Sequence, residues 1–240
     1  MLTRWQGAGF SLSAECRGAG GTTGGDFYTI AVRGPGHIGV VIGDMCGRGA
    51  EGHAHLSRLL PKLHALALSG RSPSSLLTEL NQAAALELPI DRFVTAAAFE
   101  LDIRAAVLTV ANAAHVPAIV RRARGRDVLV AGRASGIPLG IDRNTTYAEE
   151  RFALNRGDVV VLMTDGLLEA VEPDLLTMGT LKGLLAGAYG GHREVHRLLL
   201  RKLDEGADSR VDDMTLLAME AAPHPSWRSL ERMERCAYLS

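Results

Sequence analysis

Residues 26–44 read DFYTIAVRGPGHIGVVIGD, with two short apolar runs on either side of a Gly-Pro-Gly segment. This pattern predicts a β-hairpin whose strands cover residues 26–33 and 37–44. If Pro35 is the centre of the turn, Asp26 and Asp44 lie opposite each other, with Cβ atoms roughly 5 Å apart. A register shifted by one residue would place the two side chains on opposite faces of the sheet, so this inference depends on the turn.

Two facing carboxylates repel each other, and one of them stays protonated unless a cation lies between them. Two further aspartates also stand next to apolar runs: Asp165 follows the strand expected at 159–163, and Asp212 precedes the one expected at 215–220. No equally regular set of Lys or Arg accompanies the four aspartates. Oxygen ligands favour hard divalent cations, so the sequence predicts a Mg²⁺ or Mn²⁺ site built from these four side chains.

Each aspartate taken alone has a simpler explanation. Asp44 and Asp165 could cap the helices expected after them, and Asp212 with Asp213 could form a charged loop. Another enzyme class is also to be weighed, because residues 24–27 (GGDF) resemble the Gly-Gly-Asp-Glu-Phe signature of diguanylate cyclases. Here, however, Phe27 replaces the glutamate, and the motif precedes the hairpin instead of forming its tip.

The composition is that of one folded domain. The chain has 240 residues, of which 47% are apolar and 22% charged. We expect a domain over 8–221 and a C-terminal tail over 222–240, which could hold a short helix near 227–236. The net charge of −1 predicts no nucleic-acid partner. Three cysteines without paired spacing, no signal peptide and no membrane span together indicate the cytoplasm.

Hydrophobic periodicity predicts two helical pairs inserted among many antiparallel strands, which is an α+β pattern rather than a strict βαβ alternation. The expected helices cover 50–69, 73–87, 174–188 and 191–204. The expected later strands cover 93–102, 105–113, 116–122, 127–131, 147–154, 159–163 and 215–220. The basic segment 121–126 is expected to be a solvated hairpin tip, and His115 is expected to hold a turn together by hydrogen bonds.

An all-aspartate site suits phosphoryl chemistry. Two Mg²⁺ or Mn²⁺ ions about 4 Å apart can share a water molecule and lower its pKa, and the resulting hydroxide can attack phosphorus in line. Arg48 or Arg92 could add a contact to the phosphate. The predicted reaction is therefore hydrolysis of a phosphate ester by a metal-activated water.

Six segments, taken in order, resemble the motifs of metal-dependent protein phosphatases, the PPM or protein phosphatase 2C family. The similar branch is the bacterial one that includes the sporulation stage II protein E (SpoIIE) phosphatase and the sigma-factor-regulating serine phosphatases. The segments span about residues 10–220 and are 24–28 (GGDFY), 43–49 (GDMCGRG), 92–96 (RFVTA), 111–115 (ANAAH), 156–166 (RGDVVVLMTDG) and 212–215 (DDMT).

The resemblance implies an αββα sandwich, in which two packed antiparallel sheets are flanked by helix pairs. It implies phosphoserine or phosphothreonine substrates on a regulatory protein, such as an anti-sigma-factor antagonist, and an activating protein that could act on helices 50–69 and 73–88. It also implies a centre of two Mn²⁺ or Mg²⁺ ions with Asp44 bridging them. The implied ligands are Asp26, Asp44, the Met45 carbonyl, Asp165, Asp212 and, as a further candidate, Asp213, with Arg48 as the candidate phosphate-binding residue.

Two segments depart from the family pattern. The usual Asn-Ala-Gly-His-Pro-Pro appears as residues 112–117 (NAAHVP), and the usual Gly-Lys-Gly appears as 47–49 (GRG). Neither departure removes a metal carboxylate, but both put the local loop geometry in doubt. We therefore expect a metal-dependent phosphoprotein phosphatase. The alternative is a catalytically weak pseudophosphatase that serves as a phosphoprotein-binding module.

Overall fold

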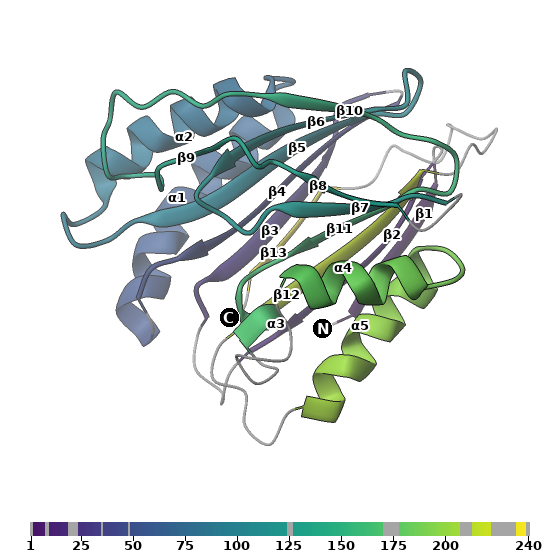
Figure 1. Ribbon diagram of the computed structural model, residues 1–240. Coiled ribbons are helices and arrows are strands. Elements are labelled where there is room, and N and C mark those ends of the chain that lie inside the picture. Colours follow the sequence, from purple (N-terminus) through teal and green to yellow (C-terminus); the bar gives the residue numbers. More distant parts are fainter. Residues whose placement is uncertain are drawn as a thin grey trace.

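The chain folds into two β-sheets packed face to face, with helices on both outer sides (Figure 1). This computed structural model describes residues 2–7, 10–18, 24–34, 36–47, 49–123, 127–169, 178–206, 213–221 and 234–238. The expected α+β class and its αββα layering are confirmed. Within these ranges, none of the helices is both long and apolar enough to span a bilayer.

Within the described ranges, one sheet has six strands and the other seven, and all pairs of named strands except β6–β9 are antiparallel. The first has the order β1 (Leu2–Gly7), β2 (Phe10–Arg17), β12 (Met214–Ala221), β11 (Val159–Met163), β7 (Ala118–Arg121), β8 (Val128–Ala131). The second has the order β10 (Glu150–Ala153), β6 (Val107–Ala113), β5 (Val94–Asp102), β4 (His37–Met45), β3 (Asp26–Val32), β13 (Glu234–Tyr238), with β9 (Ser135–Gly136) beside β6.

Four of the five described helices lie close to where the periodicity predicted them. The five are α1 (Gly49–Leu68), α2 (Pro73–Glu87), α3 (Gly166–Glu169), α4 (Met178–Gly187) and α5 (His192–Gly206), of which α3 was not among the helices expected from periodicity. Ser72 caps α2, because its side chain accepts a hydrogen bond from the Ser75 N–H, and Pro73 occupies the first turn, where a missing N–H costs nothing. The α1–α2 pair covers the seven-stranded sheet, and α4 and α5 cover the six-stranded one.

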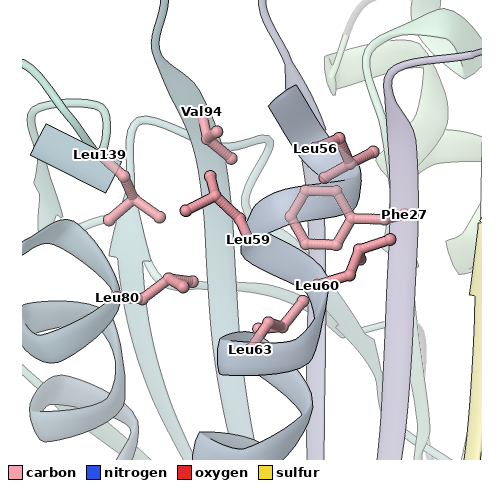
Figure 2. A pocket seen from close by; sticks show the side chains of 8 residues that line it. All are labelled: Phe27, Leu56, Leu59, Leu60, Leu63, Leu80, Val94 and Leu139. Atoms are coloured by element: carbon pink, nitrogen blue, oxygen red, sulfur yellow. The ribbon is translucent and has the colours of Figure 1, made fainter. Parts of the chain in front are cut away.

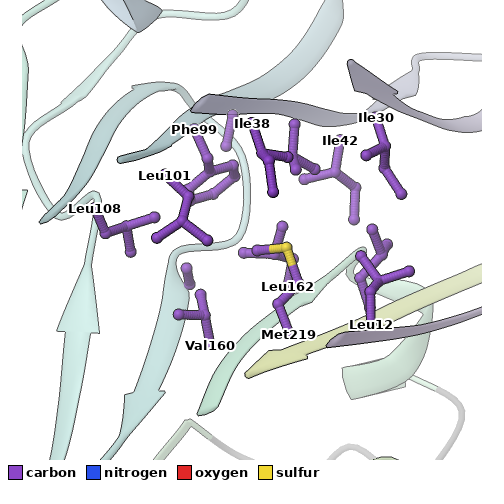
Figure 3. Close-up of a cluster of buried hydrophobic side chains, with 14 of the residues drawn as sticks. Leu12, Ile30, Ile38, Ile42, Phe99, Leu101, Leu108, Val160, Leu162 and Met219 are labelled. Carbon is purple, nitrogen blue, oxygen red and sulfur yellow. The ribbon is translucent and has the colours of Figure 1, made fainter. Parts of the chain in front are cut away.

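Alternation along each strand divides the core into three layers. On β3, Tyr28 and Ile30 face the other sheet, whereas Phe27 and Ala31 face α1 and α2. Figure 3 shows the apolar cluster between the sheets, in which Ile42 and Phe99 of one sheet lie above Leu162 of the other. Asp26 and Asp44 continue the same face of β3 and β4 and stand at one end of this apolar layer.

A small cavity of about 10 Å³ lies behind this end of the sheet, between α1, α2, β3 and β5 (Figure 2). Its lining is apolar throughout: Phe27, Leu56, Leu59, Leu60, Leu63, Leu80, Val94 and Leu139. A space of this size and character barely accommodates one water molecule and offers it no polar partner. We therefore regard it as a packing defect and not as a ligand site.

Three expectations about local structure need correction or extension. Strands β1 and β13 lie outside the expected domain range 8–221, yet each pairs with a strand inside it. The helix expected near 227–236 falls mostly outside the described residues, and its last three positions belong to β13 instead. Arg121, expected in a solvated tip, is only 6% exposed and donates to the carbonyls of Ala188 and Gly190, which ties the tip to the α4–α5 connection.

Candidate metal centre

The β3–β4 hairpin places two carboxylates side by side, as its sequence predicted. Asp26 is the register partner of Asp44, and Asp44 is in turn the partner of Thr95 on β5. Register partners point to the same face of a sheet. The three side chains therefore form a row across β3, β4 and β5, on the face that meets the other sheet.

Asp26 occupies an environment that disfavours its ionised form. It is 2% exposed, and burial raises its pKa well above the ordinary value, with the charge of Asp44 as the next cause and that of Asp213 as a smaller one. The hydroxyl of Thr164 donates to Asp26 Oδ2 at 2.7 Å and acts in the opposite direction. Thr164 is itself fixed, because its Oγ1 accepts the Thr215 N–H at 2.9 Å.

Gly24 and Gly25 allow the acidic side chains to approach the backbone. A Cβ at Gly24 would lie 2.3 Å from Asp213 Oδ2, and one at Gly25 would lie 2.4 Å from Asp44 Oδ1 and 2.7 Å from the Met45 carbonyl oxygen. The Gly25 N–H donates to Asp213 Oδ2 at 3.1 Å. Any residue with a side chain would therefore fill the space in which these oxygen atoms gather.

Asp165 lies in the turn between β11 and α3, with neighbours on both sides that contact the same cluster. Thr164 before it binds Asp26, and a Cβ at Gly166 after it would lie 1.8 Å from the Asp213 carbonyl oxygen. The Asp165 side chain is exposed, and its Oδ1 accepts the Gly166 N–H at 3.0 Å. This bond goes to the first residue of α3, whereas a helix cap accepts from the second or third N–H, so the capping explanation for Asp165 is not supported.

The structure brings together part of the expected site. Asp26, Asp44, Met45 and Asp213 converge, and Asp165 stands next to them, whereas Asp212 and Arg48 lie outside the described residues. Among the residues that are described, no three His, Cys, Asp or Glu side chains have the spacing of a complete metal site. The ligand set as a whole therefore stays a prediction.

The residues present nevertheless fit a divalent cation. A buried carboxyl whose pKa is raised by burial and by two neighbouring carboxylates is favoured in its ionised form when a cation is added. The donor atoms at hand are carboxylate and carbonyl oxygens, which suit Mg²⁺ or Mn²⁺ better than softer metals.

Four residues near the cluster were missing from the expected site or had no assigned place in it. Thr164 donates to Asp26, and the Thr215 N–H donates to Thr164. The only sequence signal for these two residues is that Thr164 precedes Asp165 and that Thr215 follows shortly after Asp213. Arg92 lies against the turn that follows Met45, because a Cβ at Gly47 would meet its Nη1 at 1.9 Å. His115 is 6% exposed, and Asn112 binds its backbone N–H and carbonyl, which confirms that it belongs to a fixed turn.

Comparison with known proteins gives a consistent family relationship. The family model described as stage II sporulation protein E (SpoIIE) matches residues 34–222. Stage II sporulation protein E of Bacillus subtilis (strain 168) is 23% identical over 224 residues, which are 91% of this chain and 26% of that protein. The phosphoserine phosphatase RsbU of the same organism is 26% identical over 145 residues, covering 60% of this chain and 43% of RsbU. The chain thus spans less than half the length of either relative.

Solved structures share the fold at low identity. The PP2C phosphatase domain of SpoIIE from Bacillus subtilis, with a fragment of its regulatory domain, has a TM-score of 0.75 at 20% identity, covering 92% of this chain and 70% of that one. RsbX in complex with magnesium has a TM-score of 0.72 at 16% identity, covering 92% of this chain and all of RsbX. The RsbU and RsbW domains of Rv1364c from Mycobacterium tuberculosis have a TM-score of 0.74 at 25% identity, covering 90% and 61%.

Proposed function

Because the chain belongs to the stage II sporulation protein E (SpoIIE) family, we propose that it is a metal-dependent protein serine/threonine phosphatase. It hydrolyses phosphoserine or phosphothreonine on a regulatory protein. The observation that carries this proposal is the buried Asp26. It faces Asp44 in the strand register, and its pKa is raised by burial, by the charge of Asp44 and, less, by that of Asp213. Such an arrangement is costly in a protein that has no cation to place there.

The metal would be Mn²⁺ or Mg²⁺, as two ions. The residues that would hold them are Asp26, Asp44, the Met45 carbonyl, Asp165, Asp212 and Asp213. A divalent cation in such a centre supplies positive charge that stabilises phosphoryl oxygens and lowers the pKa of a water molecule. The magnesium complex of RsbX, which shares this fold, is in keeping with that choice of metal.

The residues of the chain prepare this centre. Thr164 orients Asp26 Oδ2, and the two glycines before Asp26 keep space for the oxygen atoms of Asp44 and Asp213. Arg48 is the candidate contact for the substrate phosphate, because a guanidinium can bind two phosphoryl oxygens at once. The burial of Asp26 strengthens its electrostatic interactions, since the local dielectric is low.

The substrate would be a phosphorylated regulatory protein, such as an anti-sigma-factor antagonist. The printed name of RsbU, a phosphoserine phosphatase, supports the choice of phosphoserine. An activating protein could act on α1, which packs directly behind β3 and β4, and on α2, which packs behind β5 and β6. A pseudophosphatase that only binds its phosphorylated partner is the alternative, but it would not need to retain the buried Asp26 opposite Asp44.

Turnover tests the proposal. The purified protein should hydrolyse a phosphoserine peptide and, slowly, p-nitrophenyl phosphate when Mn²⁺ is added, and Asp44→Asn should remove both activities. Asp204→Asn is the control. Asp204 lies exposed on α5, where it pairs with Arg17 of β2, and its substitution should not affect turnover. A folded protein that binds phosphopeptides without metal-dependent turnover would identify the pseudophosphatase instead.

A further inference from the structure

His115 stands where the chain crosses from one sheet to the other. The residue follows β6 of the seven-stranded sheet and precedes β7 of the six-stranded sheet. In register, β7 runs beside β11, with Ile119 opposite Val161, so the segment before β7 continues alongside the end of β11. This end carries Thr164 and Asp165, and His115 is therefore close to the part of the other sheet that completes the candidate centre.

Asn112 fixes the backbone of His115. The Asn112 Oδ1 accepts the His115 N–H at 2.8 Å, and Nδ2 donates to the His115 carbonyl at 2.9 Å and to the Gly132 carbonyl at 2.9 Å. Asn112 is 1% exposed, so these hydrogen bonds are shielded from water. Ala114 between them has a φ of 56°, which only a well-determined turn imposes on a residue other than glycine.

The imidazole ring reaches both halves of the site. Its Nδ1 lies 3.0 Å from the hydroxyl of Thr95, the register partner of Asp44. The Met163 carbonyl lies near enough to the ring to act on its pKa in the upward direction, although Nε2 has no partner with full hydrogen-bond geometry. Burial lowers the pKa of His115 to about 4, so the ring is neutral at pH 7 and one nitrogen can accept while the other donates.

We propose that His115 is a positioning residue for the metal centre, which holds the end of β11 against the row formed by Asp26, Asp44 and Thr95. The inference rests on the proposed function, since it gives His115 a role only if a cation binds there. His115 touches no reacting atom in this view. It keeps Thr164, which binds Asp26, at a fixed distance from the strand pair that carries Asp44. Outer residues that orient metal ligands commonly affect metal affinity tenfold to a hundredfold.

The test compares Mn²⁺ affinity among variants of the full chain, by titration calorimetry and by the rise in melting temperature on adding Mn²⁺. We expect His115→Ala to weaken Mn²⁺ binding about tenfold or more. His115→Gln should recover part of the loss, because its amide oxygen can accept from Thr95. Thr95→Val keeps the shape of the side chain and should also weaken binding. The double variant should bind no more weakly than His115→Ala, because both changes break one connection.

His192→Gln is the matched control. His192 is also a buried histidine that binds a side chain, Glu220, but this pair lies at the opposite end of β12 from Asp213. The control should lower the melting temperature without changing Mn²⁺ affinity. Unchanged Mn²⁺ affinity in both Thr95→Val and His115→Ala would overturn the proposal, as would a wild-type protein that binds no Mn²⁺. A wild type that binds Mn²⁺ but lacks turnover would refute the phosphatase function alone and leave the affinity comparison decisive.

Discussion

Asp26 and Asp44 are register partners on adjacent strands, and the pKa of the buried Asp26 carboxyl is raised well above its usual range by burial and by the charge of Asp44. This relationship links the hairpin to the proposed chemistry. Without a cation, the folded protein bears the cost of placing two carboxylates together. With a cation, the same geometry becomes a source of binding energy.

Replacement of Asp26 by asparagine should therefore have opposite effects on the stability of the protein without a cation and with one bound. In EDTA at pH 8, we expect Asp26→Asn to stabilise the fold by on the order of 1 kcal/mol, because it removes a buried ionisable group. With Mn²⁺ present, the variant should lose most of the metal-induced rise in melting temperature. Calorimetry in EDTA and in Mn²⁺ measures both, and equal destabilisation in the two conditions would contradict this explanation.

Gly25 is expected to be intolerant of any side chain. A Cβ there would lie 2.4 Å from Asp44 Oδ1. We expect Gly25→Ala to weaken Mn²⁺ binding by more than tenfold, because the carboxylate must move. Gly183→Ala on α4 is the matched control: nothing lies within 4 Å of the added Cβ, and the helix should gain about 1 kcal/mol. Calorimetric titration and urea unfolding check the two outcomes, and tight Mn²⁺ binding by Gly25→Ala would refute the first.

The buried His115 should make the fold sensitive to acid. Its pKa is about 4 when folded, against about 6.5 in an unfolded chain, so the unfolded state binds more protons between these values. The free energy of unfolding therefore falls as the pH is lowered from 6.5 to 4, by on the order of 3 kcal/mol from this group. Urea unfolding at several pH values should reveal this slope in the wild type and a smaller one in His115→Gln. Identical slopes would mean that His115 does not titrate in this window.

Ala114 occupies the position of the glycine in the usual family motif, and it has a φ of 56°. This left-handed conformation costs an alanine roughly 1 kcal/mol or more relative to glycine. Since Ala114 is exposed, its methyl group contributes little packing, and we expect Ala114→Gly to stabilise the fold by about 0.5–1 kcal/mol.

A pair of alanines in another turn tests the same argument. Ala106 has a φ of 53°, whereas its neighbour Ala105, in the same turn, does not have a positive φ. Ala106→Gly should be neutral or stabilising, whereas Ala105→Gly should cost about 0.4–1 kcal/mol. Thermal unfolding of both variants provides the measurement, and equal losses would count against the backbone explanation.

The sequence by itself determined the local structure and the pairing of Asp26 with Asp44. Both follow from short-range rules, because hydrophobic periodicity defines strands and helices, and the short connection between β3 and β4 defines the register of these two strands. For the same reason, the helix boundaries of α1 and α2 agree with the expectation to within about a residue. The edge strands β1 and β13 lack so clear a pattern and depend on partners elsewhere in the chain.

Only the tertiary structure decided how the remaining parts of the site meet. The hydrogen bond from Thr164 to Asp26 joins residues 138 positions apart, and that from Gly25 to Asp213 joins residues 188 apart. Such contacts exist because two sheets pack face to face, and no periodicity within one strand specifies which side chain of the opposite sheet will be near. The composition of the centre could therefore be anticipated from acidic motifs, whereas the roles of Thr164, Thr95 and His115 arise from packing between the sheets.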